Sequence, residues 1–124
     1  MIADSSFIFK SIEEGEVEQL FGSKTLDFAF YEVSNIIWKQ HTLLEQIEQE
    51  EQEELLELLD MIEKEIEIWK ADRQETMEIA GEKEIAFYDA SFIYLARMHG
   101  EKLATLDEEL REKCSKVETE SGDF

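Results

Sequence analysis

Four acidic residues lie at positions in this sequence where carboxylates could do chemistry together. Asp4 ends a short apolar run, and Glu32, Asp89 and Asp107 each lie where an apolar segment gives way to a helical pattern. Hard divalent cations such as Mg²⁺ bind carboxylate oxygens and keep several waters for contact with a substrate. A metal held in this way can polarise phosphodiester oxygens and lower the pKa of a water nucleophile. A cluster of these acids would therefore suit phosphodiester hydrolysis.

Each acid also has a simpler interpretation that involves no site. Asp107 and Asp89 could be acids in the first turn of a helix, where the helix dipole favours them. Glu32 could be a surface residue beside Asn35. Asp4 is the hardest to explain in this way, because it places a charge next to a run that is expected to be buried. The joint placement of the four acids is therefore more informative than any one of them.

The elements that would position these acids are short strands alternating with helices. We expect strands at residues 2–3, 26–28, 65–69 and 102–105, and near Val117. We expect helices from a capping box at 11–14 to Phe21, over 30–40, over 70–80 up to a stop at Gly81, over 88–100, and after a T-x-x-E capping box that begins at Thr105. Between them, an exposed helix or loop over 45–54 leads into an amphipathic segment that ends at Ile66. This alternation predicts an α/β fold with a mostly parallel sheet covered on both faces. Sites in such sheets gather at the carboxyl ends of strands, next to which Asp4 and Asp107 lie.

The composition is that of a folded domain rather than a disordered acidic tail. The chain has 124 residues, of which 43% are hydrophobic, and this length suits a single domain over 1–124 with a frayed tail from about residue 118. The single cysteine, Cys114, cannot form an intramolecular disulfide. The N-terminal stretch has neither the basic region nor the long apolar run of a signal peptide, and no run approaches a membrane span. These features predict a cytoplasmic protein.

The net charge of −20 is distributed unevenly along the chain. Residues 1–40 hold 3 bases and 7 acids, residues 41–86 hold 4 and 16, and residues 87–124 hold 5 and 9. Nucleic-acid-binding proteins normally present a basic surface, and no basic cluster is visible here. A phosphate-bearing substrate would need metal cations as intermediaries. A basic protein partner is an independent possibility.

Other residues with chemical potential form no recognisable site. His41 and His99 are far apart, with no metal-ligand spacing around them, and Cys114 has no second cysteine. The sequence contains neither a glycine-rich phosphate loop nor a G-x-S-x-G nucleophile elbow.

Four blocks of sequence carry a resemblance to a known family. They are Asp4-Ser5-Ser6, the stretch YEVSNIIWK at 31–39, the stretch YDASFIYLA at 88–96 and the stretch ATLDEEL at 104–110. Their order and spacing resemble the motif blocks of PIN domains across nearly the whole chain. The likeness is greatest to the VapC-like toxins of prokaryotic toxin–antitoxin pairs.

This resemblance implies a Mg²⁺- or Mn²⁺-dependent endoribonuclease, often a homodimer. The implied fold is a three-layer α/β/α sandwich around a mostly parallel sheet of about four to five strands. The family's acidic quartet, which holds metal and carries out catalysis, matches Asp4, Glu32, Asp89 and Asp107. Hydroxyl and amide positions that support the quartet match Ser6, Asn35 and Thr105. The resemblance also implies an antitoxin whose basic segment crosses the site.

Two features depart from the family pattern. No basic residue follows Asp107 before Arg111, and the chain is unusually acidic for an enzyme that cuts RNA. An alternative function is therefore a catalytically weak PIN-like module that mainly binds a basic protein through the acidic middle segment. A third hypothesis, a purely helical acidic protein, is opposed by the strand patterns near both ends.

Overall fold

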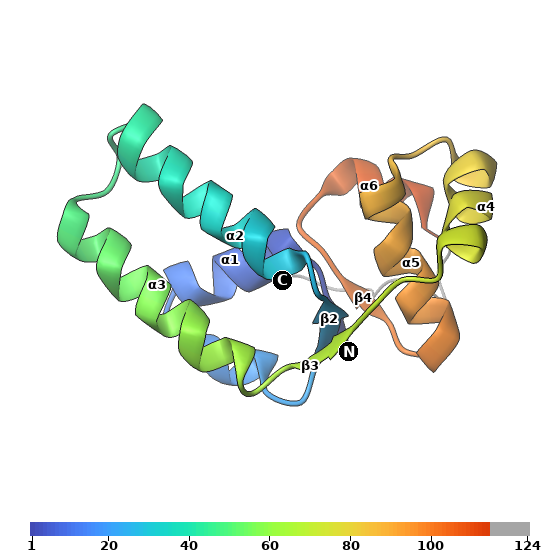
Figure 1. Cartoon of the computed structure of the whole chain (residues 1–124), viewed down its shortest axis with the longest axis horizontal. Helices are drawn as coiled ribbons and strands as arrows, with labels where there is room; N and C mark the ends of the chain where they lie inside the picture. The colour runs from blue at the N-terminus through green and yellow to red at the C-terminus, as the bar shows by residue number, and fades with distance from the viewer. Residues whose placement is uncertain (115–124) are drawn as a thin grey trace.

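The computed structural model describes residues 1–114, which form a four-stranded sheet between two groups of helices (Figure 1). The strands are β1 (Ile2–Ala3), β2 (Lys24–Leu26), β3 (Glu67–Trp69) and β4 (Leu103–Ala104). They lie in the order β3-β2-β1-β4, and every pairing is parallel. The strand expected near Val117 and the tail from residue 118 fall outside the described residues.

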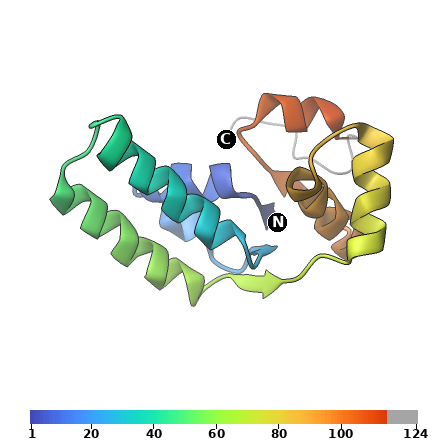
Figure 2. The same ribbon diagram turned by 45° about the horizontal axis from the view of Figure 1, so that its top comes forward.

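Helices cover both faces of this sheet. On one side α1 (Ser5–Glu13), α2 (Ala29–Trp38) and α3 (Gln49–Glu63) pack against one another. On the other side lie α4 (Arg73–Lys83), α5 (Phe87–His99) and α6 (Glu108–Lys113), as Figures 1 and 2 show. A 3₁₀-helix, η1 (Val17–Leu20), follows α1, and a π-helix, η2 (Lys39–Leu43), extends α2. The predicted α/β sandwich with a parallel sheet is confirmed, and the purely helical hypothesis is wrong.

The first helix begins at Ser5, well before the capping box predicted at residues 11–14. Asp4 has an extended backbone, and its side chain accepts a hydrogen bond of 2.9 Å from the Phe7 amide, so Asp4 is the N-cap. Ser11 lies fully buried inside α1 and donates a 2.8 Å hydrogen bond to the Phe7 carbonyl. The prediction was wrong because a serine hydroxyl can also bond to the carbonyl four residues earlier in a helix.

The boundaries of α4 also differ from the prediction. The helix begins after Asp72, whose side chain accepts a 2.9 Å hydrogen bond from the Glu75 amide. It continues through Gly81, which was predicted to stop it, to Lys83, and Glu84 then caps its end in the left-handed conformation with φ 55°. Glycine permits a helix end without requiring one, since its cost inside a helix is only about 1 kcal/mol.

The glutamate-rich segment predicted as an exposed helix or loop over 45–54 contains both, because a loop gives way at Gln49 to a helix that continues into the predicted amphipathic stretch. Residues 45–48 form no helix, and α3 then carries the amphipathic stretch, burying Leu59 and Ile62. The predicted strand within 65–69 is confirmed as β3, whereas β2 lies two residues before its predicted position at 26–28.

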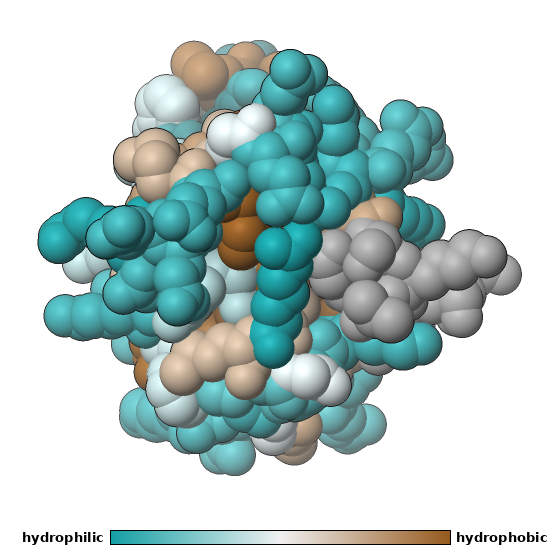
Figure 3. All heavy atoms as spheres, turned by 90° about the vertical axis from the view of Figure 1, so that its right-hand side faces the viewer, coloured by the Kyte–Doolittle hydropathy of each residue, from teal (hydrophilic) through white to brown (hydrophobic). Residues whose placement is uncertain are grey.

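The core contains β1, β4 and the inner face of α5, which was predicted to be buried, together with residues of β2, α1, α2 and α3. Ile2, Ala3, Leu103 and Ala104 are fully buried, and α5 buries six of its thirteen residues. The outer face that carries α4, α5 and α6 is mostly hydrophilic, with small apolar patches between polar side chains (Figure 3). Among residues 1–114, no helix combines the length and apolar character needed to span a membrane.

Candidate functional site

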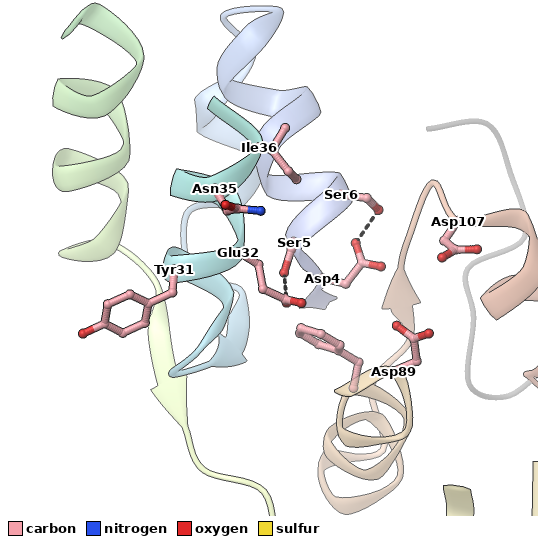
Figure 4. Close-up of a pocket in the computed structure, with 10 residues that line it drawn as sticks. Asp4, Ser5, Ser6, Tyr31, Glu32, Asn35, Ile36, Asp89 and Asp107 are labelled. Atoms are coloured by element: carbon pink, nitrogen blue, oxygen red, sulfur yellow. Dashed lines mark hydrogen bonds between the residues drawn. The ribbon is translucent and has the colours of Figure 1, made fainter. Parts of the chain in front are cut away.

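A pocket of about 460 Å³ at the carboxyl end of the sheet brings together all four acids that the sequence singled out (Figure 4). Each acid comes from a different part of the chain: the end of β1, the first turns of α2 and α5, and the segment between β4 and α6. Ser6 and Asn35, the hydroxyl and amide positions expected to support the acids, also line the pocket. The remaining wall is formed by Ser5, Tyr31, Ile36 and Phe92.

Asp4 is the most buried of the four acids, with 5% of its surface exposed. Its Oδ1 accepts hydrogen bonds from the Phe7 amide at 2.9 Å and from the Ser6 hydroxyl at 2.7 Å. Burial raises the pKa of Asp4, hydrogen bonds from Thr105, Phe7 and Ser6 partly oppose that rise, and the nearby charge of Asp107 adds to it. These hydrogen bonds therefore orient the Asp4 carboxylate in a position where burial disfavours its charge.

Glu32 lies in the first turn of α2 and is positioned from α1. The Ser5 hydroxyl donates a 2.5 Å hydrogen bond to Glu32 Oε1, so the two helices fix this carboxylate between them. Sequence reasoning gave Ser5 no role, because a contact between residues 27 positions apart has no local signature.

The pKa of Asp89 reflects the charges of the other three acids. It lies in the first turn of α5, half-buried, and desolvation raises its pKa to about 6, with further contributions from the charges of Asp107, Asp4 and Glu32. An ordinary aspartate titrates near 3.9. The four carboxylates are therefore close enough to repel one another across the pocket.

Asp107 caps α6, a role that the sequence had assigned to Thr105. Its side chain accepts a 3.1 Å hydrogen bond from the Leu110 amide, and its own amide donates to Thr105 Oγ1 at 3.1 Å. Thr105 is fully buried and lies 3.5 Å from Ser6 Oγ, which accepts a 3.0 Å bond from the Leu106 amide. This network joins the loop after β4 to the start of α1, so the Thr105 hydroxyl supports the site without lining it.

The charges of these four acids are not compensated within the described residues. Among residues 1–114, no cationic side chain forms an ion pair with any of them. Arg111, the first base after Asp107, donates a 2.5 Å hydrogen bond to the Thr105 carbonyl. In Figure 4 the side chains of Asp4, Asp89 and Asp107 face a common space, whereas Tyr31 points away from it.

The sequence of residues 2–116 matches the family model described as the PIN domain. The chain belongs to the PIN domain family. This PIN domain is also similar to the crystal structure of PAE2754 from Pyrobaculum aerophilum, with a TM-score of 0.78 and 23% identity over 94% of this chain and 86% of that one. At this identity the likeness establishes the fold alone. No curated protein is similar enough to the chain to count as a match.

PIN domains are generally metal-dependent nucleases and usually bind divalent ions such as Mg²⁺. The donors in this PIN domain fit such an ion by their chemistry, since all are carboxylate oxygens without a cationic partner. As they lie, no three His, Cys, Asp or Glu side chains within residues 1–114 are close enough together to form a metal-binding cluster. The four carboxylates repel one another across the pocket, and a cation among them would reduce that repulsion.

The remaining predictions concern residues outside the pocket. His41 Nδ1 lies 2.9 Å from the Ile47 carbonyl, and His99 packs edge to face on Trp69 with ring centroids 4.4 Å apart. Neither histidine lines the pocket.

The sequence analysis gave Tyr31 and Phe92 no role, although their positions relative to the acids place them near the pocket. Tyr31 directly precedes Glu32, and Phe92 lies three residues after Asp89, on the same face of a helix.

Proposed function

We propose that this PIN domain is a metal-dependent endoribonuclease that hydrolyses RNA phosphodiesters. The observation that carries the proposal is the meeting of four carboxylates from separate elements in one pocket, with no cationic partner among residues 1–114. Burial and repulsion raise the pKa of Asp89 to about 6. A carboxyl group that lies in a pocket and has so strongly shifted a pKa is typical of a functional site.

In this proposal the acids divide into two roles. Asp4, Asp89 and Asp107 hold one or two Mg²⁺ or Mn²⁺ ions, and Glu32 holds a metal or orients the attacking water. When bound, the metal would polarise the phosphodiester and lower the pKa of the water nucleophile. It would also bring a polyanion into a pocket that otherwise repels it.

Three polar residues support the carboxylates. Ser6 donates to Asp4 at 2.7 Å, and Thr105 accepts from the Asp107 amide at 3.1 Å, so both orient acids that face the common space. Asn35 lines the pocket one turn after Glu32 and offers an amide to a substrate oxygen.

Calorimetric titration with Mn²⁺ tests the metal site. Asp4→Asn keeps the Oδ1 acceptor that caps α1, so the fold should persist, but it removes the charge. We expect Mn²⁺ binding to be lost in Asp4→Asn. Asp72→Asn is a matched control, because Asp72 caps α4 in the same way and lies outside the pocket. Equal binding by Asp4→Asn and the wild-type protein would disprove a metal site built on Asp4.

Cleavage of a labelled single-stranded RNA tests the reaction itself. The wild-type protein should cut it in Mg²⁺ or Mn²⁺ and lose this activity in EDTA. Asp4→Asn should be inactive, with an unchanged circular dichroism spectrum. Retained cleavage in that variant would contradict the proposed roles.

We further propose that the enzyme acts as a VapC-like toxin, is a homodimer, and is inhibited by an antitoxin with a basic segment. The support is the likeness of the four sequence blocks and an open acidic pocket, in which an arginine could form charge-assisted pairs with carboxylates. Expression of the wild-type chain alone should arrest bacterial growth, and Asp4→Asn should not. Light scattering should give twice the chain mass of 14.6 kDa.

The alternative is a catalytically weak module that mainly binds a basic protein. It is favoured by the sixteen acids against four bases in residues 41–86. It predicts no cleavage with either metal, together with salt-sensitive binding of polylysine. RNA cleavage that depends on Asp4 would exclude it.

A further inference from the structure

A second pocket, of about 480 Å³, opens beside the carboxylate pocket at the same end of the sheet. Its wall comes from the connection after β2, the connection after β3 and the start of α5. The residues on which the following steps depend are Asp27, Phe28, Lys70, Arg73, Phe87 and Tyr88. We refer to it as the aromatic–basic pocket.

The charge of this pocket is opposite to that of its surroundings. Its wall holds two cations, Lys70 and Arg73, against one acid, Asp27. Four other pockets within residues 1–114, including the carboxylate pocket, each have more acids than bases in their walls. Lys70 and Arg73 are exposed, and neither forms an ion pair with a described residue. In a chain of net charge −20, the wall of this pocket holds one more cation than acid, and this favours an anion here.

The aromatic side chains of the pocket are held in place by one another. Phe28 packs edge to face on Tyr88, with ring centroids 5.0 Å apart, and on Phe92 at 5.5 Å. Tyr88 nevertheless keeps 58% of its surface exposed. A held, exposed aromatic ring can stack an unpaired base with little loss of conformational entropy.

The same aromatic cluster joins the two pockets. Phe92 lines the carboxylate pocket, Phe28 lines the aromatic–basic pocket, and the two rings are in contact. Tyr88 also directly precedes Asp89 in α5. A strand of RNA with one phosphate at the carboxylates could therefore place a neighbouring nucleotide in the aromatic–basic pocket.

We propose that the aromatic–basic pocket binds an unpaired nucleotide of the RNA next to the phosphodiester that is cleaved. The base stacks on Tyr88, its phosphate meets Lys70 and Arg73, and Asp27 accepts a hydrogen bond from an amino group on the base edge. This inference rests on the proposed ribonuclease function. It accounts for how so acidic a chain attracts RNA, since the carboxylate pocket alone repels it.

Photo-crosslinking tests where the base lies. The probe is a single-stranded RNA twelve-mer of mixed sequence with 5-iodouridine at each uridine, bound to the wild-type protein in Ca²⁺. Peptide mapping should locate crosslinks on Tyr88 or Phe87. Crosslinks confined to exposed aromatic residues elsewhere, such as Tyr31 or Trp38, would overturn the proposal.

Fluorescence anisotropy with the same RNA, unmodified and labelled, tests the stacking contribution. Tyr88→Ala should weaken binding about tenfold, because base–aromatic stacking contributes in that range. Trp38→Ala is the matched control, since Trp38 is a half-exposed aromatic residue that lines neither pocket, and its affinity should stay within about twofold. Equal affinities of Tyr88→Ala and the wild-type protein would overturn the stacking role.

The salt dependence of binding tests the phosphate contacts. The slope of log affinity against log salt should fall by about 0.7 in Lys70→Gln/Arg73→Gln, since neutralising one phosphate of a single strand contributes about 0.7. Lys64→Gln/Lys102→Gln removes the same charge from exposed positions outside the pocket and should leave the slope unchanged. Equal slopes in the two double variants would overturn the phosphate role.

Mn²⁺ calorimetry separates this inference from the proposed function. Tyr88→Ala should bind Mn²⁺ as the wild-type protein does, because it leaves all four carboxylates in place. If the wild-type protein binds Mn²⁺ and cuts RNA while Tyr88→Ala retains full RNA affinity, only this inference fails. If the wild-type protein neither binds Mn²⁺ nor cuts RNA, the proposed function fails and this inference fails with it.

Discussion

The two ends of the sheet hold carboxylates in opposite electrostatic states. At the amino end, Glu101 forms ion pairs with Lys24 Nζ and the terminal ammonium of Met1, and the hydrogen bond from Lys24, followed by that from the terminal ammonium, lowers the pKa of Glu101 to about 2. At the carboxyl end, no described cation pairs with Asp4 or Asp89. Burial raises the pKa of both, that of Asp89 to about 6.

This difference separates an acid that stabilises the fold from acids that are available for function. Glu101 joins the amino ends of neighbouring strands and is paired by charges of its own chain. The acids of the carboxylate pocket receive hydrogen bonds that orient them but no cation that neutralises them. Their charge is compensated only if something binds.

The strongest test of this comparison is Asp89→Asn. RNA cleavage in Mg²⁺ should fall by roughly 100-fold or more, because a proposed metal ligand is removed and the loss even of a group that only supports a ligand costs about 10- to 100-fold. The free energy of unfolding in EDTA at pH 7.5 should rise, since the substitution removes a partly desolvated charge that faces three other acids. Cleavage rates and urea unfolding measure the two effects. A variant that is less stable and fully active would contradict the proposal.

Metal binding should neutralise the acids at the carboxyl end, as Lys24 and the terminal ammonium already neutralise Glu101 at the amino end. With Mg²⁺ at 100 times its dissociation constant, the free energy of unfolding should rise by about 2.7 kcal/mol, because the ion binds only the folded chain. Scanning calorimetry should show this stabilisation in the wild-type protein and in Glu101→Gln, but not in Asp4→Asn. Stabilisation of all three proteins by the same amount would place the ion elsewhere.

The pH dependence of the stability of the metal-free protein tests the raised pKa of Asp89. The pKa of Asp89 is raised from 3.8 to about 6 on folding, so the folded state binds the proton more tightly than the unfolded state. Stability should therefore increase as the pH falls from 7 to 5. The increase should be smaller in Asp89→Asn, measured by thermal unfolding in EDTA. Identical pH profiles of the two proteins would contradict the raised pKa.

The smallest expected effect concerns the amino end. Glu101→Gln should cost about 1 kcal/mol of unfolding free energy at pH 7 and leave RNA cleavage unchanged. Because folding lowers the pKa of Glu101 from 4.5 to about 2, this stabilisation is present above pH 4.5 and is lost as the pH falls toward 2. Glu14→Gln, which breaks only the exposed 2.9 Å pair with Lys10, should change stability little and serves as the control. A loss of cleavage in Glu101→Gln would show that the two ends are not independent.

Much of the candidate site could be predicted from the sequence because its signals are local. Asp4 directly follows one apolar strand, Asp107 lies shortly after another, and Asp89 opens a helix that is apolar almost all round. In a parallel sheet the carboxyl ends of the strands meet, so these positions had to lie near one another. The alternation of strands and helices likewise predicted the fold class.

The helix starts were predicted less well, because two capping signals compete in each case. Ser11 and Thr105 both begin a capping-box pattern, yet Asp4 and Asp107 are the caps. A cap requires non-helical backbone directly before the helix, as at Asp4 and Asp107, whereas a hydroxyl inside a helix or loop can form other hydrogen bonds. Only the folded backbone decides between these partners.

By itself, the sequence determined the α/β class, the four acids, and the position of Asp4 and Asp107 after strands, since these follow from periodicity and residue type over short distances. The tertiary structure alone decided which charges are paired. It brought Lys24 to Glu101 across 77 positions, left the acids at the opposite end without a described cation, and assembled the aromatic–basic pocket from three separate segments. The physical reason is that ion pairing and burial depend on distance in space, which no local pattern in the sequence contains.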